Sequence, residues 1–236
     1  MKILSCDIWS TLLRANPEYV AQRTSLIAEC IAQEHSLDAV AKAIGEAYRE
    51  LDAHINADGT QFGFDTWVKR TAAALGADEP SHSKLVEFEE RLVAAQLQYL
   101  PAFTEPDLVD TFRGIASTGV KIAVISNTSM TRGVTLKRSL ELLGLGQFIE
   151  FYLFSDEFGC NKPDPRIFNA LVEQAGVTPN DILHVGDNPI ADVQGAINAG
   201  MHALHYTPKG EVTPTTFTRL SELRNHPLWR TLTVTA

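Results

Sequence analysis

The apolar residues divide the chain into three stretches with different periodicities. A short, mostly apolar run at Lys2–Cys6 predicts a buried strand, and a polar turn follows it at once. From about Pro17 to Leu100, apolar residues recur at helical spacing and no convincing strand interrupts them. After Pro101, short β-branched runs alternate with helical segments. This alternation predicts a parallel sheet covered by helices, interrupted near its start by an all-helical insert.

The expected elements follow from this pattern and from turn and cap residues. Asp164 is the expected N-cap of one helix, with Pro165 at its first position. The insert is expected to hold helices at Glu18–Glu34, Leu37–Ala53, Asp65–Leu75 and Lys84–Tyr99, with a loop at Asn56, Asp58 and Gly59. Helices are expected later at Pro106–Ser117, Thr131–Leu143, Pro165–Ala175, Pro189–Asn198 and Phe217–Asn225. The later strands are expected at Lys121–Ile125, Phe151–Phe154, Ile182–Val185 and Met201–His205.

Composition narrows the class of protein. The 236 residues suffice for one large domain or for a core with an insert. A hydrophobic content of 44% and a mean hydropathy of −0.06 are typical of a soluble globular protein. No apolar run approaches about 18 residues, so we expect no membrane partner. The start has too short an apolar run for a secretory signal, and three widely spaced cysteines fit reduced thiols, so a cytoplasmic location is expected.

The net charge of −9 argues against a nucleic-acid partner. It does not argue against a small anionic substrate, because the local charge of a cleft can oppose the global charge. The sequence makes no prediction of the oligomeric state.

Polar side chains follow several predicted strands at the point where each strand ends. Asp7 follows the first strand, Ser126 ends the next core strand, and Asp187 follows the strand at Ile182–Val185. Lys162 lies in the loop after Phe154. Each residue alone is explained as a cap, a turn residue or a solvated lysine. Ligands bind beyond the carboxyl ends of open parallel sheets, so the four together indicate one site.

Four segments carry a resemblance to the haloacid dehalogenase superfamily, which includes many phosphatases. They occur in the expected order and cover most of the chain, and the third and fourth are the more specific. The resemblance implies an α/β fold: a Rossmann-like doubly wound parallel sheet core at 1–14 and 100–236, with an inserted helical cap domain at 15–99. The segments are Asp7-x-x-x-Thr11-Leu12, VISN ending at Ser126-Asn127, KPDPRIF from Lys162, and HVGDNPIADVQGA from His184.

The resemblance also implies a covalent hydrolytic mechanism. Asp7 would attack phosphorus or carbon and form an ester. For phosphoryl transfer, Mg²⁺ would be held by Asp7, Asp187 and the backbone carbonyl of Trp9. Asp192 is either a weaker ligand position or a helix residue bonded to the loop. The expected substrate-binding residues are Trp9, Ser126, Asn127 and Lys162, and Thr11 and Asn127 are expected to orient the site.

Position 9 departs from the phosphatase pattern. Phosphatases of this superfamily resemble DxDxT, in which the second Asp is the acid and base, whereas Trp9 has no titratable proton near neutral pH. One interpretation is a phosphatase whose leaving group needs no proton, such as an acyl phosphate. A second is a metal-free dehalogenase, whose first motif resembles D-x-aromatic-G-T. A third is a weakly active or inactive protein that binds Mg²⁺ and a phosphate-like ligand.

Several features weigh against the dehalogenase interpretation. The chain keeps Gly186-Asp187 where that branch has Ser and Asn, and Phe168 replaces a tyrosine of its third motif. Arg14 and Arg23 are candidates for a halide-binding arginine by location only, and solvated surface arginines are the simpler explanation. Other notable residues have structural explanations: His184 and Cys6 as core side chains, and Phe62, Phe64 and Trp67 as packing between insert helices.

Overall fold

The computed structural model describes residues 2–31 and 34–233, and its main sheet has the strand order β5-β4-β1-β6-β7-β8. All five neighbouring pairs in this sheet are parallel, which confirms the predicted fold class. The order reverses at β1, because the chain passes first to β4 and β5 and later to β6 and β7 on the other side. The strands are β1 (Ile3–Cys6), β4 (Lys121–Ser126), β5 (Ile149–Phe154), β6 (Ile182–Gly186), β7 (His202–Tyr206) and β8 (Thr216–Phe217).

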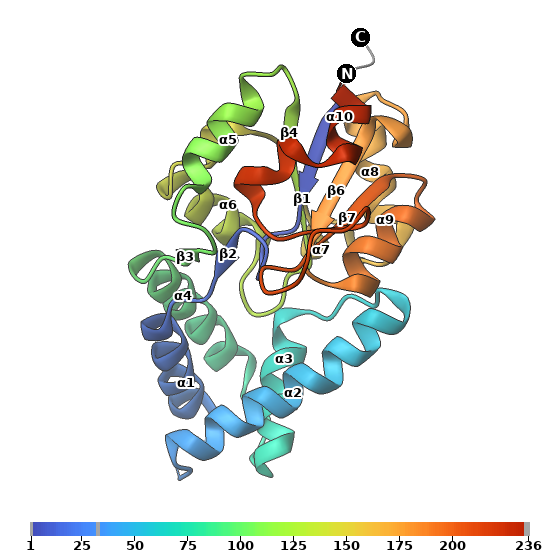
Figure 1. Cartoon of the computed structure of the whole chain (residues 1–236). Coiled ribbons are helices and arrows are strands. Elements are labelled where there is room, and N and C mark those ends of the chain that lie inside the picture. The colour runs from blue at the N-terminus through green and yellow to red at the C-terminus, as the bar shows by residue number, and fades with distance from the viewer. Residues whose placement is uncertain (1, 32–33, 234–236) are drawn as a thin grey trace.

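Side-chain alternation along the strands creates a core on each face of the sheet. Leu4 and Cys6 of β1 pack in one core with α5 (Leu108–Ala116) and α6 (Gly133–Leu142). Ile3 packs in the other core with α8 (Pro165–Ala175). Successive residues of a strand point to opposite faces, so a strand that is buried on both faces reads as a continuous apolar run. Figure 1 shows the two groups of helices on either side of the sheet.

Four helices form the helical insert, which joins β1 to the rest of the sheet. They have their own core, which includes Leu51, Trp67 and Leu92. Figure 1 shows this helical insert beyond the carboxyl ends of the strands. A two-stranded ribbon of β2 (Leu13–Arg14) and β3 (Ala102–Phe103) lies where the chain leaves the sheet and returns. The helices are α1 (Pro17–Ile31), α2 (Leu37–Asp58), α3 (Phe64–Leu75) and α4 (His82–Gln98).

Some expected boundaries were wrong. Asn56 and Asp58, expected in a loop, belong to α2, because Leu51 and Ile55 continue its buried stripe. Gly59 ends that helix with a φ of 75°, and its N–H donates to the carbonyl of Ile55. The first expected helix ends at Ile31, and residues 32–33 of that prediction lie outside the described residues.

The tail also differs from expectation. A helix at Phe217–Asn225 is wrong: Phe217 belongs to β8, a 3₁₀ turn covers Leu220–Asn225, and α10 (Pro227–Thr233) follows. The expected helix at Pro189–Asn198 begins as a π-helical turn and becomes α9 (Gly195–Asn198). The short helix α7 (Ser155–Phe158) after β5 was not expected. Within the part of the chain that the structure describes, no helix is long and apolar enough to cross a membrane.

Candidate active site

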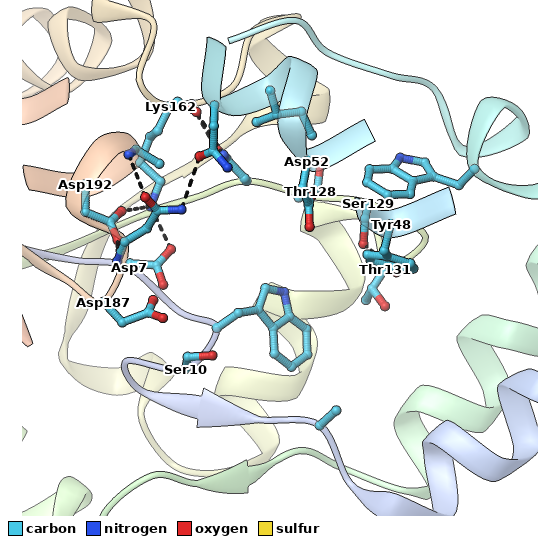
Figure 2. A pocket seen from close by; sticks show the side chains of 18 of the residues that line it. Asp7, Ser10, Tyr48, Asp52, Thr128, Ser129, Thr131, Lys162, Asp187 and Asp192 are labelled. Atoms are coloured by element: carbon cyan, nitrogen blue, oxygen red, sulfur yellow. Dashed lines mark hydrogen bonds and ion pairs between the residues drawn. The ribbon is translucent and has the colours of Figure 1, made fainter. Parts of the chain in front are cut away.

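Four charged side chains converge beyond the carboxyl ends of β1 and β6, where the strand order reverses. Asp7 directly follows β1, and its N–H donates to the carbonyl of Val185 at 2.9 Å. Asp187 directly follows β6, and Lys162 lies in the loop before α8. Figure 2 shows these side chains and Asp192 pointing toward one another. The sheet topology therefore brings together residues that are up to 185 positions apart in the sequence.

Lys162 is the centre of this charged group. Its side chain is almost fully buried, with the residue 1% exposed. Its Nζ donates to Oδ1 of Asp7 at 2.6 Å, to Oδ1 of Asp192 at 2.6 Å and to the carbonyl of Ile125 at 2.8 Å. An ammonium group has three protons, so every donor is satisfied. Burial lowers the pKa of Lys162, but the adjacent Asp192 and Asp7 more than offset this and raise it overall.

Asp192 forms a buried ion pair with this lysine. Burial raises its pKa, but Lys162 and His184 outweigh burial and hold the pKa of Asp192 well below its usual range. Its second oxygen, Oδ2, accepts the N–H of Asn188 at 2.9 Å. His184 lies 3.4 Å from Oδ1 through Nε2, and its Nδ1 lies 3.0 Å from Oγ of Ser5. His184 is therefore a buried, hydrogen-bonded core histidine, as expected from the sequence.

Gly186 is required by the position of Asp192. A Cβ built at Gly186 would lie 2.2 Å from Cγ and from Oδ2 of Asp192. Any side chain at this position would therefore displace the carboxylate that holds Lys162. The π-helical turn at Pro189–Gln194 starts at the Asn188 cap and places Asp192 against this glycine. Such turns are frequent at functional sites.

In contrast to Asp192, whose pKa is lowered, Asp7 and Asp187 have raised pKa values. Burial raises the pKa of Asp7 to about 7; Lys162 opposes this rise, and the charges of Asp192 and Asp187 add to it. Burial, followed by the charge of Asp192, also raises the pKa of Asp187. A carboxylate oxygen from each of the three acids lies within 4.8 Å of the other two. Carboxylate oxygens are the ligands that Mg²⁺ prefers, and a cation here would relieve the repulsion between Asp7 and Asp187. The residues therefore fit a divalent cation.

Three other predicted site residues, Asn127, Thr11 and Ser126, form hydrogen bonds next to the charged group. Asn127 clamps the Lys162 loop, because its Nδ2 donates to the carbonyl of Lys162 at 3.0 Å and its Oδ1 accepts the N–H of Lys162 at 2.7 Å. Thr11 is fully buried and donates to Oδ1 of Asp187 at 3.5 Å. Ser126 is fully buried and donates to the carbonyl of Asn127 at 3.2 Å. Thr11 and Ser126 are not among the residues that line the cavity, whereas Trp9 is.

A cavity of about 370 Å³ opens in front of the charged group. Its core wall includes the Asp7 and Asp187 carboxylates, Trp9 and the loop after β4, and its opposite wall is formed by the helical insert. Figure 2 shows Tyr48 and Asp52 across from Asp7, near the Thr128, Ser129 and Thr131 side chains. The cavity residues contributed by the four helices of the insert are Tyr19, Arg23, Tyr48, Asp52, Ile55, Asn56 and Trp67.

Sequence reasoning missed most of the insert side of this cavity. Tyr48, Asp52 and Asn56 are spaced four residues apart, as are Tyr19 and Arg23. Residues spaced in this way lie on one face of a helix, so polar and aromatic residues at this interval were the available signal. That signal does not say which face of the helix meets the sheet.

Three hydrogen bonds join the helical insert to loops of the sheet around the cavity. The hydroxyl of Tyr19 lies 3.1 Å from that of Thr131, and the hydroxyl of Tyr48 lies 3.0 Å from that of Ser129. On the other side of the cavity, Nδ2 of Asn188 donates to Oδ1 of Asn56 at 3.1 Å. These bonds fix how the insert lies over the carboxyl ends of β4 and β6.

Comparison with known proteins identifies the family. The family model described as "haloacid dehalogenase-like hydrolase" matches residues 1–200. The chain therefore belongs to the haloacid dehalogenase-like hydrolases, as the sequence motifs indicate, and the class is that of phosphatase-like or dehalogenase-like hydrolases.

Three relatives illustrate the match, two of them over long segments. The haloacid dehalogenase-like hydrolase domain-containing protein 3 of Bos taurus is 28% identical over 212 residues, which cover 86% of this chain and 80% of the relative. Its counterpart of the same name in Mus musculus is 41% identical over 93 residues, 39% of this chain and only 36% of that protein. A glyceraldehyde 3-phosphate phosphatase of Methanopyrus kandleri is 30% identical over 168 residues, 66% of this chain and 64% of the phosphatase.

Solved structures share the fold. The magnesium-bound HAD hydrolase YfnB of Bacillus subtilis has a TM-score of 0.72 at 19% identity, and the match covers 95% of this chain and 97% of YfnB. The L-2-haloacid dehalogenase of Xanthobacter autotrophicus has a TM-score of 0.65 at 18% identity, with the same coverage of both chains. A magnesium-bound HAD hydrolase and a dehalogenase thus share this architecture, so the fold alone does not determine the reaction, which depends on the site residues.

Proposed function

We propose that this protein hydrolyses the phosphoryl group from a small, anionic metabolite in a Mg²⁺-dependent reaction, with Asp7 as the nucleophile. The observation that carries the proposal is the position of Asp7, held at 2.6 Å by the buried Lys162 and beside a second carboxylate, that of Asp187. Relatives named as phosphatases support it, among them the glyceraldehyde 3-phosphate phosphatase of Methanopyrus kandleri. Metal-free dehalogenation would leave Asp187 without a role.

In the proposed reaction, a carboxylate oxygen of Asp7 attacks phosphorus. The new oxygen–phosphorus bond forms while the bond from phosphorus to the leaving oxygen breaks, which gives an aspartyl-phosphate. Water then attacks the phosphorus of this intermediate, the bond from phosphorus to the Asp7 oxygen breaks, and inorganic phosphate, which keeps the protons of the water, is released. Lys162 stabilises the charge of the transferring group, and Asn127 keeps Lys162 in place by bonding its backbone on both sides. We assign Ser126 to phosphate binding as well, after rotation of its hydroxyl away from Asn127.

Asp7, Asp187 and the carbonyl of Trp9 would hold the Mg²⁺ ion. When bound, the ion neutralises charge on the phosphate oxygens. Asp192 is a poorer ligand, because its two oxygens already accept hydrogen bonds from Lys162 and from the N–H of Asn188. Thr11 orients Asp187 through its hydroxyl.

Trp9 determines which leaving groups the site can release. The indole contributes to the cavity wall and has no proton to give at neutral pH. Loss of a general acid costs about 10²–10⁴-fold in rate when the leaving group needs a proton. Acyl phosphates and phosphoanhydrides, whose leaving groups depart as stable anions, are therefore the substrates that lose least.

We assign the helical insert, with boundaries at residues 15–99, to substrate selection as a cap. The rest, 1–14 and 100–236, would be the catalytic core. The cavity wall supports this assignment, since Arg23, Tyr48 and Trp67 of the insert lie across from the charged group. In such an arrangement the core performs the chemistry and the cap determines which molecule fits.

A second candidate function is metal-free hydrolysis of a carbon–halogen bond. The observation in its favour is that an aromatic side chain, Trp9, and an arginine, Arg23, line the same cavity as Asp7. Halide leaves without a proton, so the absence of an acid costs nothing. The third candidate is binding of Mg²⁺ and a phosphate-like ligand without turnover. It would use the same residues as the proposed phosphatase, namely Asp7, Lys162 and Asp187.

An activity screen separates these candidates. Phosphate esters, acyl phosphates and 2-haloacids are each incubated with Mg²⁺ and with EDTA. The proposal predicts phosphate release that requires Mg²⁺ and disappears in Asp7→Asn, while Asp38→Asn, an exposed acid on α2, behaves as wild type. Halide release that survives EDTA would establish the second candidate instead. Mg²⁺ binding that Asp187→Ala removes, with no turnover of any substrate, would establish the third.

A further inference from the structure

Contacts with two tyrosine rings hold Arg23 in place at the end of the cavity formed by the helical insert. Its guanidinium lies over two tyrosine rings, 5.9 Å from the ring centre of Tyr19 and 5.6 Å from that of Tyr48. Both tyrosine hydroxyls are hydrogen-bonded to the loop after β4, through Thr131 and Ser129. The two aromatic contacts fix the arginine on the cavity wall, and the rings are themselves held by the sheet.

Two buried donors at this end of the cavity have no acceptor among the described residues. Nε of Arg23 is buried and has no hydrogen-bond partner among the described residues. Nη1 of Arg23 makes a long contact of 3.5 Å to the Tyr48 hydroxyl, and within residues 2–31 and 34–233 no carboxylate forms an ion pair with this guanidinium. Nε1 of Trp67 is also buried without a described acceptor, on a side chain that is 1% exposed. Its ring contacts Tyr48, with centroids 4.6 Å apart.

Buried donors without partners are rare in folded proteins, and each one calls for an explanation. Arg23 and Trp67 both line the cavity that contains Asp7. A ligand in the cavity would supply the missing acceptors. The two donors come from different helices, α1 and α3, and both contact Tyr48 of α2. We call these two residues the Arg23–Trp67 corner.

We propose that the Arg23–Trp67 corner binds a carboxylate on the leaving group of the substrate, so that the enzyme prefers substrates whose leaving group carries a carboxylate. This inference rests on the proposed function, which places the phosphate at Asp7. The Nε edge of a guanidinium matches the two oxygens of a planar carboxylate, and the indole N–H can donate to one of them. The aromatic rings around Arg23 strengthen these bonds by excluding water.

The other charges of the cavity favour a carboxylate over a second phosphate. Asp52 lines the same cavity one helical turn beyond Tyr48, and Asp7, Asp187 and Asp192 line its core wall. Of the cations there, Lys162 is already bound to two carboxylates. Arg23 is the cation without a described ion-pair partner, so it can balance one negative charge. A monoanionic carboxylate matches that balance, whereas a second dianionic phosphate would face Asp52 with excess charge.

The test compares acyl phosphates, whose leaving groups depart as stable anions, that differ only in a distal carboxylate. Fumaroyl phosphate is paired with crotonoyl phosphate, and 4-carboxybenzoyl phosphate with 4-methylbenzoyl phosphate, all assayed with Mg²⁺. Three variants test the corner. Arg23→Gln removes the positive charge, and Arg23→Lys keeps the charge but removes the paired N–H donors of the planar guanidinium. Trp67→Phe removes the indole N–H donor. Arg70→Gln is the control, because Arg70 lies on α3 outside the cavity and pairs with Glu50.

We expect wild type to prefer the carboxylate member of each pair in kcat/KM. Arg23→Gln should lower kcat/KM for that member by about 10- to 100-fold. The carboxylate-free member should change by less than about 3-fold, as should both members in Arg70→Gln. Arg23→Lys and Trp67→Phe should each reduce the preference in part. A loss in Arg23→Gln that is equal for both members, or a wild type without preference, would overturn the inference while the proposed function stands.

A binding measurement keeps the two proposals separate. Calorimetric titration of fumaroyl phosphate and crotonoyl phosphate into wild type and Arg23→Gln reports the subsite without turnover. If neither compound is hydrolysed, the proposed function fails, but tighter binding of fumaroyl phosphate that Arg23→Gln removes would still support the subsite. Equal binding of both compounds to wild type, or binding of neither, would overturn it.

Discussion

Removing the negative charge of Asp192 should strongly destabilise the folded protein. Its Oδ1 lies 2.6 Å from Nζ of Lys162, and the side chains of both residues are 2% exposed. Breaking a buried ion pair by neutralising one partner typically costs about 3–5 kcal/mol, because the remaining charge stays buried. In Asp192→Asn, Lys162 would retain only one carboxylate, that of Asp7. We therefore expect the free energy of unfolding to fall by about 3–5 kcal/mol at neutral pH.

The hydrogen bonds point in the same direction as the charge. In the wild type, one oxygen of Asp192 accepts from Lys162 and the other accepts from the N–H of Asn188. An asparagine amide has one acceptor and one donor end, so either orientation places its NH₂ against another donor. An unsatisfied buried donor costs about 1–3 kcal/mol. Asp192→Asn conserves volume, so the measured loss reports charge and hydrogen bonding and not a cavity.

Urea denaturation followed by circular dichroism, in buffer with EDTA, measures this loss. Asp110→Asn is the matched control: Asp110 is exposed, pairs with Arg113 at the surface, and should change stability by less than about 1 kcal/mol. Because the folded pKa of Asp192 is depressed, its contribution is present above the unfolded pKa of about 3.9 and is lost as pH falls toward the folded pKa. The gap between wild type and Asp192→Asn should therefore narrow in acid. A gap below about 1 kcal/mol at neutral pH, or one that does not narrow in acid, would refute the reasoning.

Three further predictions concern the first loop. Trp9→Asp should raise phosphate release from alkyl phosphates, by up to about 10²-fold, if the missing acid limits the rate; an unchanged rate would show that it does not. Ser10 has a φ of 63°, so Ser10→Gly should raise the melting temperature through a gain of up to about 1 kcal/mol, and a lower melting temperature would show that the serine side chain stabilises the turn. Since the pKa of Asp7 is raised to about 7 by burial, Mg²⁺ affinity measured by calorimetry should fall as pH drops below about 7, and equal affinities at pH 8 and pH 6 would contradict this.

The core of the site was predictable because it depends on local sequence and on one topological rule. Asp7, Lys162 and Asp187 each follow a recognisable strand or precede a recognisable helix. Parallel strands place their carboxyl ends at one edge, so the sequence predicts that these residues meet although it does not show their contacts. The sheet itself was predictable for a similar reason, since its buried strands are short apolar runs between helical segments.

The remaining features depend on contacts between distant segments. Asp192 holds Lys162 only because a π-helical turn aims it and Gly186 leaves space for it, and neither condition has a period that a pattern could detect. Tyr48 and Arg23 lie on helices whose amphipathic faces were visible, but which face meets the sheet is fixed by bonds to Ser129 and other loop residues. The helix predicted at Phe217–Asn225 was wrong because Phe217 pairs with β7 at the edge of the sheet. This tertiary contact overrides a weak helical pattern.

The interactions of the core carboxylates explain why the residue at position 9 decides whether the leaving group can receive a proton. Asp192 is neutralised by Lys162, and Asp7 and Asp187 are the two acids that fit a cation. None of these core acids is left to carry a proton to a leaving group, and Trp9 cannot do so. The proton demand must therefore be met by the leaving group itself. Under the proposed function, such a site would select its substrate twice: the core would select for leaving groups that depart as stable anions, and the insert for the shape and charge of that same leaving group. Changing the insert would then alter which substrate binds, whereas a change at position 9 would widen the range of leaving groups that can be released.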